Sequence, residues 1–252
     1  MAKRIGVVGY GYVGKAMHGL FDGHFDVSFY DINGAGDRNA VMGCDISFVC
    51  VPTPMAADGS ADTTAVDEAV SYLDAPLIVI KSTVPPGTTD RLAAKYGKAV
   101  HFSPEFIVER SQADSPKAEW VVVGGPRASE VLDYFLAVMP VRAKYMACSA
   151  AEAELSKYMS NAYFAMKVTF CNEFAKIAEG VGVDYKRLRE LWLLDPRVDA
   201  DHTAVFRDAP GFGGKCLPKD LSAIIAVSQS CKVEPHLLLA VRLANAMTRN
   251  LT

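Results

Sequence analysis

The chain has 252 residues, of which half are hydrophobic and 22% are charged, and its formal net charge is -3. This is a globular composition, long enough for one large or two modest domains, and it lacks the basic excess that indicates a nucleic-acid partner. No stretch approaches the roughly 20 continuous apolar residues of a membrane span, and the glycine-broken apolar run at the start is not typical of a signal peptide, so we expect no membrane association.

The six cysteines follow no CxxC pattern and no metal-ligand spacing. Such a set is typical of reduced thiols in the cytosol. We therefore expect a cytoplasmic protein without a bound metal ion.

The first 147 residues alternate short β-rich runs with helical patterns. This order is typical of parallel βαβ units, so we predict an α/β domain over residues 1–147, with a Rossmann-like, doubly wound and mostly parallel sheet. The predicted strands cover residues 4–9, 26–30, 45–51, 77–81, 99–103, 120–125 and 141–146.

A glycine motif, "VVGYGYVG", lies between the first predicted strand and a predicted helix. Glycines at this spacing permit a tight turn, the close approach of a pyrophosphate and close helix–strand packing, while the helix start supplies N–H groups for the anion. We therefore predict a dinucleotide site, the alternative being an incidental glycine turn. The predicted cofactor-binding residues of the motif are Gly9, Gly11, Tyr12, Val13 and Gly14.

Further cofactor contacts are predicted at the ends of later strands. Asp31 ends the second strand, 17 residues beyond Gly14. An acid at this position accepts hydrogen bonds from ribose hydroxyls and repels a 2′-phosphate, which favours NAD over NADP. Thr53 and Thr83 follow two later strands, where ligands of open α/β sheets bind, although either threonine alone is also typical of a turn.

After Cys148 the pattern becomes helical, and we predict an all-helical second domain over residues 148–252. Residues 149–180 contain no proline and no internal glycine, and Ser149 and Gly180 are typical start and stop residues of a helix. Such a helix is roughly 45 Å long, typical of the spine of a helical domain or a dimer. Three more helices are predicted in "DYKRLRELWLL", "PKDLSAIIAVSQS" and "EPHLLLAVRLANAMTRNL".

The long predicted helix carries a polar face. Lys157 and Asn161 are four residues apart and share that face, and Asn172 returns close to it. A lysine with amide donors can stabilise an alkoxide or oxyanion. The alternative is a solvated polar stripe without a function.

A thiol lies at a predicted helix start in "GFGGKCLPKD". Cys216 precedes Pro218 by two residues, and proline is favoured as the first helical residue. The positive end of that helix and the neighbouring Lys215 would both lower the pKa of the Cys216 thiol. We therefore predict a nucleophilic cysteine with Asp220 near it, and a packing role for the other five cysteines.

Together these motifs resemble the UDP-glucose/GDP-mannose dehydrogenase family. The matching segments follow the family's order over nearly the whole chain: "GYGYVG" with Asp31, "VPTP", "KSTVPPGTT", "SPEFIVE", "SKYMSNAYFAMKVTFCNE" and "PGFGGKCLPKD". The resemblance implies an NAD-dependent four-electron oxidation of the primary alcohol of a nucleotide sugar, such as UDP-glucose, to the carboxylate. It also implies a role in polysaccharide biosynthesis and a homodimer formed through the long helix.

The resemblance assigns roles to individual residues. Cys216 matches the nucleophile that forms a thiohemiacetal and then a thioester with the sugar. The matched catalytic residues are Cys216, Lys157, Asn161, Asp220, Thr83 and Glu109. The matched substrate-binding residues are Glu105, Phe106, Lys157, Asn161 and Gly213.

Members usually carry a third, carboxyl-terminal α/β domain, and this sequence ends at Thr252, where that domain would begin, so we expect a short form. The second βα unit is also shorter than usual, and Lys215 replaces a small residue before the cysteine. Two alternatives stay open: a two-electron NAD dehydrogenase of the β-hydroxyacid type, and a non-catalytic NAD-binding protein. The identity of the sugar nucleotide also stays open.

Overall fold

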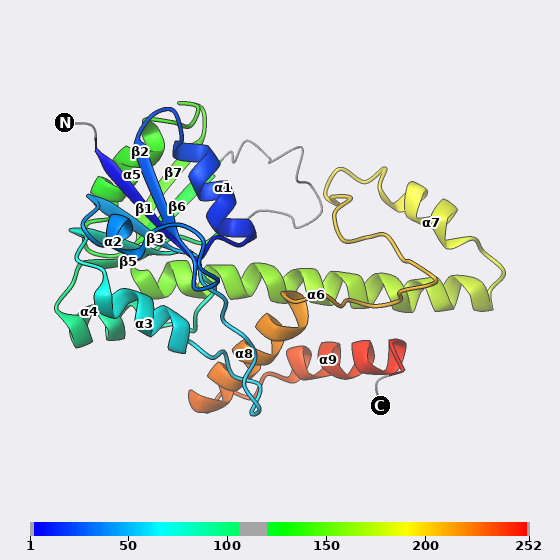
Figure 1. Ribbon diagram of the computed structural model, residues 1–252. Helices are drawn as coiled ribbons and strands as arrows, with labels where there is room; N and C mark the ends of the chain where they lie inside the picture. Colours follow the sequence, from blue (N-terminus) through cyan, green and yellow to red (C-terminus); the bar gives the residue numbers. More distant parts are fainter. Residues whose placement is uncertain (1–2, 106–119, 251–252) are drawn as a thin grey trace. The chain divides into compact units, whose positions relative to one another are not determined.

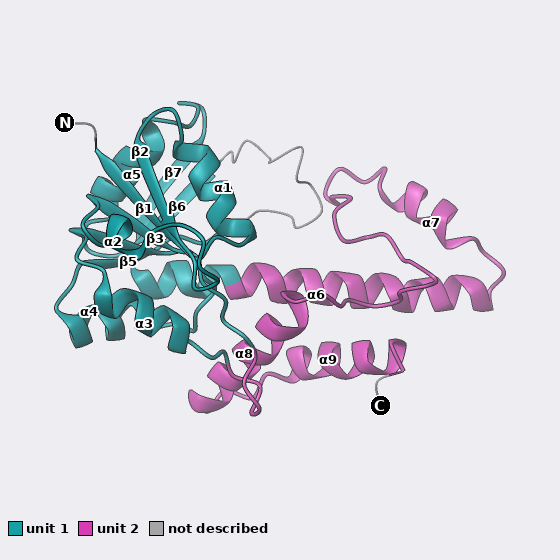
Figure 2. Ribbon diagram, viewed as in Figure 1, with its two compact units in different colours: residues 1–54, 61–157 teal, residues 55–60, 158–252 magenta. Residues whose placement is uncertain are grey.

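The computed structural model describes residues 3–105 and 120–250. The chain divides into two compact units (Figure 2). The first comprises residues 1–54 and 61–157, and the second comprises residues 55–60 and 158–252. Each unit is described below by itself.

A seven-stranded sheet forms the centre of the first unit (Figure 1). Its order is β2-β1-β3-β4-β5-β6-β7, and every pair of neighbours is parallel except β5 and β6. The strands are β1 (Arg4–Val8), β2 (Asp26–Tyr30), β3 (Ile46–Val49), β4 (Leu77–Ile80), β5 (Val100–Phe102), β6 (Trp120–Gly124) and β7 (Lys144–Cys148). The predicted Rossmann-like, mostly parallel sheet is confirmed.

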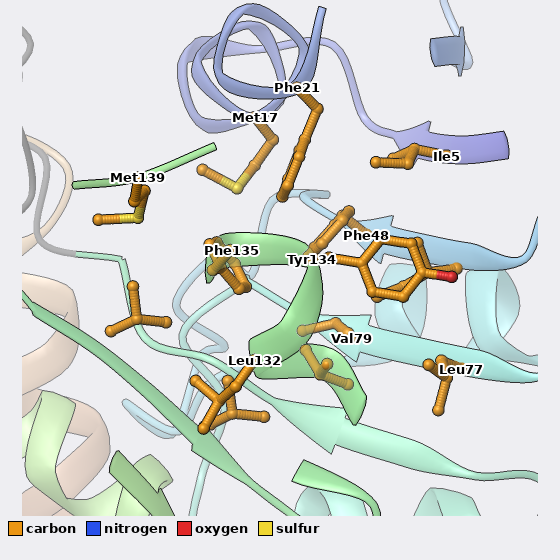
Figure 3. Packing of buried hydrophobic residues seen from close by; sticks show 14 of the residues in the cluster. Ile5, Met17, Phe21, Phe48, Leu77, Val79, Leu132, Tyr134, Phe135 and Met139 are labelled. Carbon is orange, nitrogen blue, oxygen red and sulfur yellow. The ribbon is translucent and has the colours of Figure 1, made fainter. Parts of the chain in front are cut away.

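Helices cover both faces of this sheet. They are α1 (Tyr12–Phe21), α2 (Arg38–Met42), α3 (Thr64–Tyr72), α4 (Thr88–Tyr96) and α5 (Ala128–Leu136). On one face α1 and α5 pack on the sheet, and the rings of Phe21 and Phe48 stack with their centroids 5.2 Å apart (Figure 3). On the other face α2, α3 and α4 bury an aliphatic layer that includes Val70 and Leu92. The central strands β3 and β4 are buried along their whole length because helices cover both faces there, whereas the edge strands β2 and β7 are partly exposed.

Strand order reverses next to β1. The chain pairs β2 on one side of β1 and then crosses to pair β3 on the other side. In open α/β sheets, ligands bind in the crevice beyond the carboxyl ends of the strands at such a reversal. The fold therefore points to the loops that follow β1 and β3.

The second unit is helical, with α7 (Tyr185–Trp192), α8 (Leu217–Ser230) and α9 (His236–Thr248). The long helix α6 (Ala150–Gly180) begins in the first unit and continues through the second, and its bounds match the predicted 149–180 to one residue. Ser149 and Glu152 form a reciprocal capping box at its start, each accepting the backbone N–H of the other. In the second unit α6, α8 and α9 share one apolar cluster.

No helix within residues 3–105 or 120–250 is both long enough and apolar enough to cross a membrane.

Candidate functional site

The three motif glycines after β1 occupy three different environments. Gly9 has a φ of +87°, and a Cβ there would lie 2.7 Å from the backbone of Cys50. A Cβ on Gly14 would clash with the carbonyl oxygen of Gly9. A Cβ on Gly11 would meet nothing within 4 Å, so this position faces open space. The turn, the helix–strand contact and the open approach expected of a pyrophosphate-binding motif are therefore all present.

Helix α1 begins directly after this turn, with Gly11 as its N-cap residue and Tyr12 as its first residue. The side chain of Val13 is half-buried and packs against the apolar core, while its backbone lies in the first turn of the helix. Backbone N–H groups at such a helix start, together with the helix dipole, attract an anionic group. The turn and the first turn of α1 fit the pyrophosphate of a dinucleotide.

Asp31 is held beside the glycine turn. Its carboxylate accepts hydrogen bonds from the backbone N–H of Tyr10 at 2.6 Å and of Asn33 at 3.1 Å. A carboxylate has about four acceptor positions, so capacity is left for ribose hydroxyls. The residue therefore both fixes the loop and offers an acceptor at the carboxyl end of β2.

The two predicted threonines lie close together. The Thr53 hydroxyl donates to the backbone carbonyl of Thr83 at 2.9 Å, and Ser82 ties the same loops by donating to Val51 at 2.6 Å. Thr53 is buried and committed to this contact, whereas Thr83 is half-buried. The structure thus joins the loops after β3 and β4 through a contact that the sequence pattern did not predict.

Two buried lysines converge on residues 103–105. Lys157 donates to the backbone carbonyl of Glu105 at 2.7 Å and lies 3.3 Å from its carboxylate. Lys81 donates to Ser103 and to the carbonyl of Pro104, both at 3.2 Å. Burial lowers the pKa of Lys81 to about 8. Sequence reasoning missed Lys81, although a cation at the end of the fully apolar run "LIVIK" was the signal for it.

In the second unit, Asn161 and Asp220 form a buried pair. The Asn161 side-chain amide donates to the Asp220 carboxylate at 2.5 Å, and Asp220 is 1% exposed. The other carboxylate oxygen of Asp220 accepts from Lys219. An amide and an ammonium group therefore fix the carboxylate in the first turn of α8.

Cys216 is the N-cap residue of α8, and its carbonyl accepts the N–H of Asp220 at 2.9 Å. The helix begins at Leu217, so Pro218 is its second residue and not its first as predicted. The thiol of Cys216 is exposed, at the positive end of the helix. The arrangement presents a thiol and a fixed carboxylate at the start of one helix.

Asparagines hold the glycine-rich turn before Cys216. Asn172 accepts the N–H of Gly211 at 3.0 Å and donates to the carbonyl of Val168 at 2.8 Å, so its amide holds this turn against α6. Asn245 of α9 accepts the N–H of Phe212 at 2.7 Å and donates to its carbonyl at 3.0 Å. Sequence reasoning missed Asn245, for which no local signal exists.

The remaining predicted residues are placed as follows. Phe106 and Glu109 lie outside the described residues. Gly213 lies in the turn before Cys216, and Lys157 lies one helical turn before Asn161 on α6. Among the described residues, no group of three or more His, Cys, Asp or Glu could hold a metal ion.

Two family models match the chain. Residues 34–134 match the NAD binding domain of the UDP-glucose/GDP-mannose dehydrogenase family, and residues 151–247 match the central domain of that family. The glycine motif and Asp31 precede the first matched range, so they support the assignment independently.

Similar proteins carry related names. The chain is 34% identical over 224 residues to a UDP-glucose 6-dehydrogenase of Rickettsia prowazekii, covering 83% of this chain and 51% of that one. It is 34% identical over 231 residues to the UDP-glucose 6-dehydrogenase AglM of Haloferax volcanii, covering 81% and 53%. A solved UDP-glucose dehydrogenase from Pyrobaculum islandicum superposes with a TM-score of 0.87 at 30% identity, covering 98% of this chain and 68% of that one. The chain spans about half the length of these curated relatives.

Proposed function

Because the chain belongs to the UDP-glucose/GDP-mannose dehydrogenase family, we propose that it oxidises the primary alcohol of the sugar in a nucleotide sugar to the carboxylate, with NAD as the oxidant. One structural observation supports this oxidation in addition to family membership. Cys216 caps the helix in which Asp220 is fixed by Asn161, so a thiol and a positioned carboxylate lie at one helix start.

The residues present fit NAD. Gly9, Gly11 and Gly14 leave room for a pyrophosphate at the start of α1, and Asp31 offers acceptors to the adenosine ribose. Bound NAD supplies the hydride acceptor for each of the two oxidation steps. Thr53 and Thr83 complete the proposed cofactor-binding set.

Cys216 is the proposed nucleophile. The first oxidation removes two electrons and converts the alcohol to an aldehyde. The Cys216 thiolate then forms a C–S bond to the aldehyde carbon, and the resulting thiohemiacetal loses two more electrons to become a thioester. Water cleaves the C–S bond, releasing the carboxylate and the free thiol. The sugar thus loses four electrons, and two NADH form.

The surrounding side chains stabilise charge and move protons. The Lys157 ammonium and the Asn161 amide stabilise the oxyanion that develops on the reacting carbon. Asp220, Thr83 and Glu109 are assigned to water and proton handling. Glu105, Phe106 and Gly213 are proposed substrate contacts, and the Lys157–Glu105 pair holds one of them in place.

We also propose a cytoplasmic homodimer formed through α6, acting in polysaccharide biosynthesis. Apolar side chains recur at helical spacing along an exposed face of α6, where Met159 is 75% exposed and Ile177 is 56% exposed. Tyr163, Phe170 and Phe174 belong to the same face. No disulfide joins any of the six cysteines, all of which lie within the described residues, and this pattern is typical of a reducing compartment.

The test is the yield of NADH from a panel of UDP- and GDP-sugars. We expect two NADH per sugar oxidised, with loss of carboxylate formation in Cys216→Ala. Cys231→Ala is the matched control, because Cys231 is the other exposed thiol and caps the opposite end of α8. One NADH per turnover with Cys216 dispensable would identify the two-electron dehydrogenase instead. NAD binding without NADH formation from any sugar would identify a non-catalytic protein.

A further inference from the structure

The side chain of Arg249 lies directly on the glycine-rich turn before Cys216. A Cβ built on Gly213 would lie 2.7 Å from Nη1 and 3.2 Å from Nη2 of Arg249. A Cβ on Gly211 would lie 3.1 Å from Cγ of the same arginine. The aliphatic part of Arg249 therefore covers Gly211, and its guanidinium covers Gly213. At Gly211, where φ is +74°, a Cβ would also overlap the side-chain oxygen of Asn245, whereas at Gly213 it would meet only the guanidinium end of Arg249.

The guanidinium of Arg249 has N–H donors available for a ligand. Within residues 3–105 and 120–250, no carboxylate lies within ion-pair distance of Arg249 and no acceptor takes a hydrogen bond from its side chain. The residue is half-buried, so part of its hydration is already lost. A guanidinium carries five N–H donors in a planar fork that matches the oxygens of a phosphate. The positive charge of the Arg249 guanidinium and its planar set of donors therefore favour an anionic ligand.

Hydrogen bonds fix the glycine-rich turn beneath Arg249. Asn172 holds Gly211 and Asn245 holds both polar backbone groups of Phe212. Asn245 lies one helical turn before Arg249, so the end of α9 both fixes the turn and places the cation on it. The exposed Lys215 adds a second positive charge three residues before Pro218, whereas the nearby Lys219 is paired with Asp220.

We propose that Arg249 is a substrate-binding residue that contacts the diphosphate of the nucleotide sugar. The inference rests on the proposed function, because a diphosphate is the anionic group next to the sugar in such a substrate. The turn that Arg249 covers leads within three residues to Cys216, so a diphosphate bound there lies near the thiol that receives the sugar carbon. A bidentate contact between guanidinium and phosphate adds orientation as well as affinity.

The experiment measures UDP binding by titration calorimetry. Saturating NAD is present so that the proposed anion site at the start of α1 is filled and does not bind the probe. The variants are Arg249→Gln, which removes the charge, and Arg249→Lys, which keeps the charge but loses the fork. Arg242→Gln is the matched control, because Arg242 is an exposed arginine two helical turns earlier on α9. Inorganic pyrophosphate is the second probe, because it isolates the contribution of the diphosphate.

We expect Arg249→Gln to weaken UDP binding about 10- to 100-fold, as the loss of a charged hydrogen-bonded pair does, and Arg249→Lys to fall between it and the parent. Arg242→Gln should change the affinity by less than about twofold, and pyrophosphate should show the same dependence on Arg249. Equal UDP affinity in the parent and Arg249→Gln would overturn the proposal, as would a parent protein that binds neither probe.

The two proposals fail separately. Dependence of UDP binding on Arg249 without NADH formation from any sugar would retain this inference and reject the dehydrogenase activity. If the parent forms NADH from a sugar nucleotide and Arg249→Gln has an unchanged KM for it, the dehydrogenase activity is retained and the role of Arg249 is rejected. If both hold, Arg249→Gln raises that KM while kcat stays within a few fold, and the affinity for NAD is unchanged.

Discussion

The carboxylate of Glu154 accepts both the backbone N–H and the hydroxyl of Thr89, at 2.8 Å and 2.7 Å. Its second oxygen accepts the N–H of Gly87 at 2.6 Å. Glu154 on α6 thus caps the start of α4, which is 65 residues away in sequence. The contact ties the loop that carries Thr83 to the helix that carries Lys157.

Loss of this cap should destabilise the protein strongly. Glu154 is fully buried, so Glu154→Ala leaves three donors without an acceptor, and we expect a loss of about 3 kcal/mol in the free energy of unfolding. Glu154→Gln keeps one acceptor oxygen and should lose less. Urea denaturation measures both. The control is Glu152→Ala, which removes an exposed capping carboxylate two residues earlier on the same helix and should cost about 1 kcal/mol. Equal losses for Glu152→Ala and Glu154→Ala would contradict the role of Glu154.

Lys81 should make stability rise with pH in the alkaline range. Burial lowers the pKa of Lys81 from 10.5 to about 8, so the folded state binds this proton more weakly than the unfolded state. Between these two values the unfolded chain holds more protons, and raising the pH favours folding. The parent should therefore gain about 3 kcal/mol relative to Lys81→Met between pH 8 and 10.5.

The measurement is urea denaturation of both proteins across that pH range. Other groups titrate there too, so the difference between parent and variant is the quantity to follow. Lys144→Met serves as the control, because Lys144 is exposed at the start of β7 and its difference from the parent should stay flat. A flat difference for Lys81→Met as well would mean that Lys81 is charged in the folded protein throughout.

Asp31 should set the affinity for NAD and its preference over NADP. Asp31→Asn removes the charge that we propose binds the ribose and repels a 2′-phosphate, so we expect about tenfold weaker NAD binding and a reduced preference for NAD. Fluorescence titration with each dinucleotide measures both effects. Asp26→Asn, at the opposite end of the same strand, is the control and should bind NAD as the parent does. Unchanged binding by Asp31→Asn would place the adenosine ribose elsewhere.

The Asn161–Asp220 pair should matter for turnover and not for cofactor binding. Asp220→Asn removes a buried charge held by Asn161 and Lys219, and we expect kcat to fall about 100- to 1000-fold while the affinity for NAD is unchanged. Steady-state kinetics measures kcat on whichever UDP- or GDP-sugar proves to be the substrate. A separate titration with NAD measures the affinity for the cofactor. Asp208→Asn, an exposed carboxylate before the glycine-rich turn, should leave kcat unchanged. A fall in NAD affinity with Asp220→Asn would instead indicate a general loss of structure.

The sequence by itself determined the sheet, the long helix and the family. The strands are runs of apolar residues, and the bounds of α6 follow from the absence of proline and glycine between Ser149 and Gly180. Within the glycine motif, Gly14 meets a local requirement, because a Cβ there would overlap the carbonyl oxygen of Gly9. Helix bounds and this contact depend on neighbours within a few residues, which a sequence displays directly, whereas the close approach of Gly9 to the backbone of Cys50 depends on the fold.

Only the tertiary structure decided which polar residues position others. Asn172 shares a helix face with Lys157 in the sequence pattern, yet it is used to hold Gly211, 39 residues away. Asn245 holds Phe212 across 33 residues, and Glu154 caps α4 across 65. Each of these contacts exists because a buried backbone N–H or carbonyl must find a partner, and folding, not local spacing, determines which side chain lies within reach of it.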